Sequence, residues 1–209
     1  MKTIILMKDP YDENFYIFKK TRVRLQPGVT VLVGCNGYGK TTFLKSIKDS
    51  LRDDKIKYIN FDNLIDGGSN AVSHALFYGD FSFGATAFCS SEGEQIKMNI
   101  GVLASKIRMY IDNNPEQNEY FILLDAVDSG FSIDNIQEVK RDLFNVIIED
   151  CTNRNKDVYI VVSANEYEMC YGEKCFDVYN GTYRQFRTYE SYRKFILKSR
   201  EIKDKRYNN

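Results

Sequence analysis

The stretch GCNGYGKTT occupies residues 34–42 and matches the pattern G-x-x-x-x-G-K-[ST] in full. The apolar run VTVLV precedes it at residues 29–33, and a helical pattern of apolar residues follows it. Its glycines let backbone N–H groups fold around phosphate oxygens without Cβ clashes. The N-terminus of the following helix adds its dipole to the same anion site. The stretch therefore predicts a loop that binds nucleotide phosphates; the alternative is a glycine-rich turn of matching sequence.

The chemistry of phosphate binding assigns roles to individual side chains. Lys40 is expected to reach the β- and γ-phosphates of ATP, and the Thr41 hydroxyl to bind Mg²⁺. The metal also needs an acidic ligand, and the run FILLD ends in Asp125 after four apolar residues, the Walker B pattern. An Asp that caps a turn is the alternative at this position. The loop residues expected to contact ATP are Gly34, Asn36, Gly37, Gly39, Lys40, Thr41 and Thr42, and the expected metal ligands are Thr41 and Asp125.

The composition is that of an ordinary globular protein of one domain. The chain has 209 residues, of which 43% are apolar and 28% charged, and 29 basic residues balance 29 acidic ones. No apolar run approaches the ~18 residues that span a bilayer, and the N-terminal segment turns polar too soon for a signal peptide. We therefore expect a cytoplasmic protein. The cysteines at positions 35, 89, 151, 170 and 175 lack metal-site spacing and His74 is remote, so we expect reduced thiols and no His–Cys metal site.

Strand-like and helix-like segments alternate along the chain, which predicts an α/β fold with a mainly parallel sheet. Aliphatic and aromatic residues indicate N-terminal strands within residues 3–7 (TIILM) and 15–25 (FYIFKKTRVRL). Apolar runs indicate buried strands at residues 29–33, 57–61, 120–125 and 158–164. Apolar residues spaced three or four apart predict helices at residues 40–51, from 91 to about 112, at 133–149 with Ser132 as N-cap, and from about Tyr189. Residues 62–90 predict a loop, a short helix near 70–78 and an irregular stretch.

The phosphate loop also resembles that of ABC-type ATPases, whose form is G-x-x-G-x-G-K-[ST]-T. The pair Asn36-Gly37 resembles the branch that contains SMC proteins, DNA-repair ATPases and small prokaryotic or phage ATPases. Residues 90–95, SSEGEQ, lie where this family has its LSGGQ signature, with Ser91, Gly93 and Glu94 matching. The resemblance implies that these three residues contact the γ-phosphate held by the other subunit, through a helix N-terminus. A capping box from Ser91 to Glu94 is the alternative.

The resemblance continues after Asp125, where residues 126–132 (AVDSGFS) are similar to the family's E-P-x-S-A-L-D stretch. Ala126 stands where the family has the Glu that orients or deprotonates the attacking water, and Ala can do neither. Residues 129–132 would form the D-loop at the dimer interface. Asn165 stands in the place of the switch His, where it could donate a hydrogen bond to the γ-phosphate without carrying a proton charge. The Q-loop is expected within residues 60–66.

The resemblance implies one ABC-type ATPase domain over residues 1–209 with N-terminal antiparallel strands, a helical signature part at about 62–118 and a basic C-terminal helix at about 188–206. No coiled-coil insertion separates its halves. It implies a protein that binds Mg-ATP, forms a homodimer with ATP at the interface and acts as a switch for a partner protein or nucleic acid. Ala126 is expected to impair hydrolysis. The alternatives are a non-hydrolysing scaffold or sensor and a nucleotide-binding subunit of a membrane transporter.

The C-terminal segment concentrates positive charge. Residues 184–206 contain nine Lys or Arg against three acidic residues. Tyr189, Tyr192 and Phe195 or Ile196 recur at helical spacing, so the segment can pack an aromatic face on the core and leave its charges in solvent. Contact with a nucleic-acid backbone is the sharper interpretation.

Overall fold

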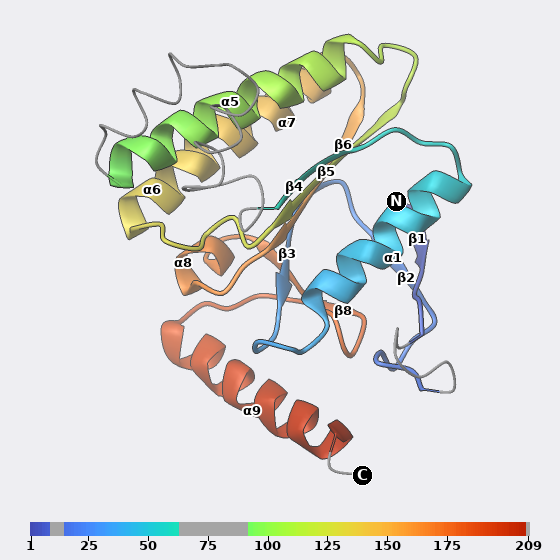
Figure 1. The fold of residues 1–209 in the computed structure, drawn as a ribbon, viewed down its shortest axis with the longest axis vertical. Helices are drawn as coiled ribbons and strands as arrows, with labels where there is room; N and C mark the ends of the chain where they lie inside the picture. The colour runs from blue at the N-terminus through green and yellow to red at the C-terminus, as the bar shows by residue number, and fades with distance from the viewer. Residues whose placement is uncertain (9–14, 63–91, 208–209) are drawn as a thin grey trace, which may run out of the picture.

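A central six-stranded sheet organises the computed structural model, which describes residues 1–8, 15–62 and 92–207, with residues 92–99 and 207 described by backbone alone (Figure 1). The strands are β1 (Lys2–Ile5), β2 (Arg22–Leu25), β3 (Gly28–Val33), β4 (Ile59–Asp62), β5 (Glu119–Asp125), β6 (Asp157–Ser163), β7 (Lys174–Asp177) and β8 (Thr182–Arg184). The helices are α1 (Lys40–Asp53), α5 (Glu92–Asp112), α6 (Ile133–Glu138), the π-helical turn η1 (Val139–Phe144), α7 (Asn145–Asn153), α8 (Tyr167–Cys170) and α9 (Tyr189–Tyr207).

The sheet order is β4-β5-β6-β3-β7-β8. The first five strands pair in parallel, and β8 pairs antiparallel with β7. A separate antiparallel pair joins β1 to β2. These pairings confirm the expected α/β class, with a mainly parallel sheet and antiparallel N-terminal strands.

The middle strands are buried along almost their whole length because helices cover both faces of the sheet. β3, β5 and β6 each expose little beyond their first residue, as parallel strands buried on both faces do. Figure 1 shows α1 on one side of the sheet and α5, α6 and α7 on the other. Because the five parallel strands run in one direction, their carboxyl ends meet at one edge, where α/β proteins bind ligands.

The position of β6 brings three sequence motifs together. β6 lies between β3 and β5, with Leu32 opposite Ser163 and Leu124 opposite Val162. The loop after β3, the end of β5 at Asp125 and the end of β6 at Ser163 therefore meet at this edge. Asn165, two residues beyond β6, is thereby placed between the phosphate loop and Asp125.

The expected helix at residues 133–149 is continuous but not uniform. It begins at Ile133 and passes through η1 before α7, and its inward apolar residues are buried as predicted: Ile136, Val139, Leu143 and Ile147. The N-cap residue is Ser132, but its side chain makes no capping bond and donates to the carboxylate of Asp134. The apolar spacing of three or four residues continues through η1, so periodicity does not reveal the π turn.

The N-terminal prediction was wrong in one part. Residues 15–18, expected in a strand, belong to no strand, and only Arg22–Leu25 forms one. Ile17 and Phe18 instead bury their side chains beside the phosphate loop. Among the described residues, no helix is both long and apolar enough to cross a membrane. The short helix expected near residues 70–78 and most of the stretch expected to hold the Q-loop lie outside the described residues.

Candidate nucleotide-binding site

Two glycines determine the path of the loop between β3 and α1. Gly34 has φ +148°, and a Cβ there would lie 2.0 Å from Cδ1 of Tyr38. Gly39 has φ +109°, and a Cβ there would lie 3.1 Å from Ile17. Both positions therefore require glycine. Gly39 is also the N-cap of α1 and offers no side-chain bond, so the first N–H groups of this helix are left for a ligand.

The Lys40 ammonium lies inside the loop and is almost fully buried. Its Nζ donates to the Gly34 carbonyl at 2.7 Å and to the Asn165 side-chain oxygen at 3.0 Å, with a longer contact of 3.4 Å to the Cys35 carbonyl. Burial lowers the pKa of Lys40, and nearby acidic groups, including Asp128 and Asp125, oppose that shift. The charged Lys40 ammonium therefore donates only to uncharged oxygens among the described residues: two backbone carbonyls and one side-chain amide.

A cavity of about 390 Å³ collects the predicted residues at the carboxyl edge of the sheet. This volume falls within the ~300–1,000 Å³ range of small-molecule sites. Its lining comes from the phosphate loop, the end of β5, the end of β6 and one N-terminal residue: Asn36, Gly37, Gly39, Lys40, Thr41, Thr42, Asp125, Ala126, Ser163, Asn165 and Ile17. Gly34 borders a neighbouring cavity instead.

The residues expected to hold a metal face this one cavity. Thr41 is the second residue of α1, and Asp125 is the last residue of β5, and both line the cavity. A hydroxyl and a carboxylate are the hard oxygen ligands that Mg²⁺ prefers beside substrate phosphates. The donor set therefore fits a magnesium ion bound together with a nucleotide.

Ala126 presents a methyl group to the cavity from an unusual backbone conformation. Its φ is +51°, which is uncommon for a residue other than glycine. The Ser129 N–H donates to the Ala126 carbonyl at 3.1 Å and closes a tight turn after β5. The turn places Ala126 in the lining of the cavity, where alanine supplies no acid or base.

Asp128 is a site residue that sequence reasoning missed. It is 2% exposed, and its Oδ2 accepts the backbone N–H groups of Asn165 and Glu166, each at 2.7 Å. Burial raises the pKa of Asp128, and these hydrogen bonds oppose the shift. The sequence carries no local signal for this role, because the residues that Asp128 bonds lie 37 and 38 positions further along the chain.

Helix α9 packs against the outside of the phosphate loop, a second contact that the sequence did not indicate. The Ser199 hydroxyl accepts the Cys35 N–H at 2.9 Å, and the Tyr192 hydroxyl donates to the Asn165 carbonyl. Tyr38 is buried against Gly34 of the loop and makes an edge contact with Phe195. Elsewhere a cavity of about 450 Å³ lies between the loop and α9, and Arg200 and Lys203 of α9 are among its lining residues.

The signature residues are placed only in part. Ser91 lies outside the described residues, whereas Gly93 and Glu94 fall in the first turn of α5, whose backbone begins at Glu92. A helix does open at the expected place, but its side chains there are not described. The contact of Ser91, Gly93 and Glu94 with ATP stays a prediction.

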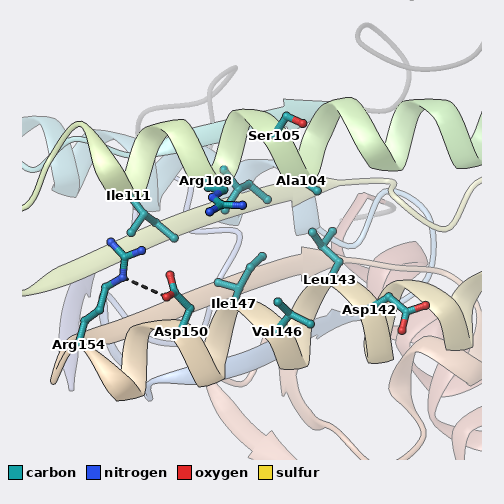
Figure 2. A pocket seen from close by; sticks show the side chains of 11 residues that line it. Ala104, Ser105, Arg108, Ile111, Asp142, Leu143, Val146, Ile147, Asp150 and Arg154 are labelled. Carbon is teal, nitrogen blue, oxygen red and sulfur yellow. Dashed lines mark hydrogen bonds and ion pairs between the residues drawn. The ribbon is translucent and has the colours of Figure 1, made fainter.

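A third cavity, of about 430 Å³, lies between α5 and the η1–α7 segment (Figure 2). Leu143, Ile147 and Ile111 line its apolar part, and an ion pair of 3.0 Å between Arg154 and Asp150 lies near one end (Figure 2). It shares no lining residue with the cavity at the phosphate loop. Its lining lacks the loop N–H groups that phosphate binding needs.

Comparison with known proteins agrees with this geometry. The model of the ATPase family associated with various cellular activities (AAA) matches residues 30–173, a span that begins in β3, contains the loop and Asp125, and extends past Asn165. No curated protein matches the chain. Because the match covers more than half of the 209 residues, the chain belongs to the AAA family of ATPases and is a P-loop, ATP-binding protein.

Proposed function

We propose that this protein is a Mg-ATP-dependent switch, in which two copies close around ATP and open slowly because hydrolysis is slow. One observation carries the proposal: a single cavity gathers the phosphate loop, Asp125 and Asn165. Family membership supports ATP binding and ATPase chemistry in general. The dimer, the metal ligands and the slow step are the finer claims.

Phosphate binding would begin at Lys40. Its ammonium group now donates to uncharged oxygens of Gly34, Cys35 and Asn165. A phosphate oxygen is a stronger acceptor, because a bond between an ammonium group and a phosphate is charge-assisted on both sides. Lys40 would therefore exchange these oxygens for the β- and γ-phosphates. That exchange would release the Asn165 amide, which lies at the same cavity and could then donate to the γ-phosphate.

Thr41 and Asp125, which line the same cavity, would hold Mg²⁺. The bound ion would neutralise negative charge on the β- and γ-phosphate oxygens. The hydrolysis step then depends on a group that orients a water molecule. Ala126 supplies no such group, and Asn165 cannot accept and carry a proton as a histidine can. ATP is therefore expected to bind well and to turn over slowly.

The first turn of α5 would complete the site of a second copy. Gly93 and Glu94 lie there, two and three residues after Ser91, and α5 is 21 residues long, so its N-terminus carries a full helix dipole. The N–H groups of a first helical turn and this dipole would suit the γ-phosphate held by another chain. The capping-box interpretation of Ser91 and Glu94 explains the same residues without a dimer, so assembly in solution decides between them.

Two other functions use the same site differently. A scaffold or sensor would bind ATP without useful turnover, and Ala126 favours this function as a second candidate. A transporter subunit would dock on a membrane partner, and no observation on the described residues favours it. Steady-state phosphate release separates the switch from the scaffold, since only the switch returns to its open form by hydrolysis.

The direct test of the site is calorimetric titration of Mg-ATP into Lys40→Ala. We expect at least a tenfold loss of affinity, because the charged donor at the centre of the loop is removed. Lys45→Ala is the matched control, since Lys45 lies on the same helix and is exposed; its affinity should stay within about twofold of the unchanged protein. Equal affinity in Lys40→Ala and the unchanged protein would contradict the assignment of the loop.

A further inference from the structure

The carboxylate of Asp128 is buried, but only one of its two oxygens has hydrogen-bond partners among the described residues. Oδ2 accepts two backbone N–H groups, but Oδ1 is buried and has no hydrogen-bond partner within the described residues. An unsatisfied buried oxygen of this kind destabilises a fold. A buried carboxylate oxygen without a partner, close to a ligand cavity, calls for an explanation, and a functional role is one candidate.

The two N–H groups bound by Asp128 belong to the segment that follows β6. Asn165 is the cavity residue of this segment, and it is fixed on both sides of its backbone. Asp128 accepts its N–H at 2.7 Å, while Tyr192 donates to its carbonyl. Only its side chain, which accepts a bond from Lys40 at 3.0 Å, can exchange partners without moving the backbone.

Asp128 also joins Asn165 to the expected metal ligand. Asp125 is the last residue of β5, and a tight turn from Ala126 to Ser129 follows it, closed by the bond between the Ser129 N–H and the Ala126 carbonyl. Asp128 lies in this turn and bonds the segment that follows β6. Its carboxylate therefore links the end of β5 to Asn165, in addition to the direct pairing of β5 with β6.

We propose that Asp128 is a positioning residue that fixes the backbone of Asn165, so that the Asn165 amide recognises the γ-phosphate and the site prefers ATP to ADP. A carboxylate suits this task because its bonds to N–H groups are charge-assisted and about twice as strong as neutral ones. The inference rests on the proposed function, in which Asn165 contacts the γ-phosphate. A purely structural Asp128 would stabilise the turn before α8 without affecting the choice of nucleotide.

The test measures the dissociation constants of Mg-ATP and Mg-ADP for Asp128→Asn, Asn165→Ala and the double variant. Asp128→Asn retains an acceptor oxygen but loses the charge. We expect its preference for ATP over ADP to fall at least fivefold, while ADP affinity stays within about twofold. The double variant should be no worse than Asn165→Ala, because residues that act through each other are not additive. Asp142→Asn, at an exposed carboxylate on η1, should leave both constants unchanged.

The outcomes separate this inference from the proposed function. If Asn165→Ala keeps the full preference for ATP, the proposed contact with the γ-phosphate is wrong. If Asn165→Ala loses the preference and Asp128→Asn keeps it, only the positioning role is wrong. Equal losses of ATP and ADP affinity in Asp128→Asn would also overturn it. If Asp128→Asn does not fold, Tyr192→Phe replaces it in the test, because this change removes the bond to the Asn165 carbonyl. A reduced preference for ATP over ADP in Tyr192→Phe would support the inference, and an unchanged preference would overturn it.

Discussion

At the scale of single residues, the alanine at position 126 has the largest expected consequence for chemistry. The turn after β5 directs this position into the nucleotide cavity from a left-handed backbone conformation, φ +51°. Lys40, Thr41 and Asp125, the described residues proposed to bind phosphate and metal, line the same cavity. Under the proposed function, the site would therefore bind Mg-ATP but lack an acid–base group at position 126.

Ala126→Glu is expected to raise the rate of ATP hydrolysis. A positioned general base typically contributes about 10²–10⁴-fold, so phosphate release should increase by at least 100-fold while ATP affinity changes little. Ala126→Gln is the matched control, because it has the same length and cannot accept a proton; it should stay near the rate of the unchanged protein. A rate of about 1 s⁻¹ or more in the unchanged protein, the low end of ordinary enzymes, would show that another residue supplies the base.

At the scale of elements, α9 is attached to the phosphate loop rather than standing apart from it. Ser199 is completely buried, and its hydroxyl accepts the Cys35 N–H while donating to the Ile196 carbonyl. The helix buries Tyr192 and Phe195 as the aromatic spacing predicted, whereas Tyr189 is exposed. The C-terminal helix therefore packs against the phosphate loop and supports its conformation.

Ser199→Ala is expected to destabilise the protein and to weaken ATP binding together. Removing the hydroxyl leaves the Cys35 N–H without its acceptor, which costs roughly 1–3 kcal/mol. Chemical denaturation measures the stability, and calorimetric titration the affinity. Ser191→Ala, an exposed serine on the same helix, should change stability by less than about 0.5 kcal/mol. Lost stability with unchanged ATP affinity would show that α9 does not shape the loop.

The positive charge of residues 184–206 is less available than the sequence indicates. Arg184 lies 4.2 Å from the Phe195 ring centre and pairs with Asp177, and Arg206 lies over Tyr179. Four other basic residues of the segment pair with acidic residues of the same helix: Arg193, Lys194, Arg200 and Lys203. In the described part of the segment, no ion pair is formed by Arg187, Lys198 and Lys205.

Any binding to nucleic acid should therefore depend only weakly on salt. Three available cations correspond to a slope of log affinity against log salt of at most about −3, since each phosphate contact contributes about −0.9. Salt titration with a DNA duplex measures this slope. A slope steeper than about −5 would contradict the charge pairing within α9 and favour a backbone-binding role for the whole segment.

At the scale of the whole molecule, local patterns predicted most of the fold and several residues that line the candidate cavity. Spacing alone located β3, β5 and β6, the loop, Lys40, Thr41 and Asp125, because these depend on residues near in sequence. Asp128 and Ser199 could not be found this way, since their partners lie 37 and 164 residues away. The order of the sheet, which places β6 between β3 and β5, is also a property of the whole chain.

The central claim concerns two molecules, because the first turn of α5 in one chain is expected to meet the ATP phosphates of another. Family membership fits assembly in general, since AAA proteins often oligomerise. A closed pair of chains is the more specific expectation. It predicts that nucleotide, rather than protein concentration alone, controls the molar mass in solution.

Molar mass measured by light scattering, with and without saturating Mg-ATP, tests this claim most directly. We expect a monomer of 24.3 kDa without nucleotide and a mass twice as large with Mg-ATP. Ser91→Arg should prevent the doubling while leaving ATP binding intact, and Ser105→Arg, at an exposed serine farther along α5, should dimerise normally. A protein that stays monomeric at high concentration with Mg-ATP, or a Ser91→Arg variant that still dimerises, would contradict the account.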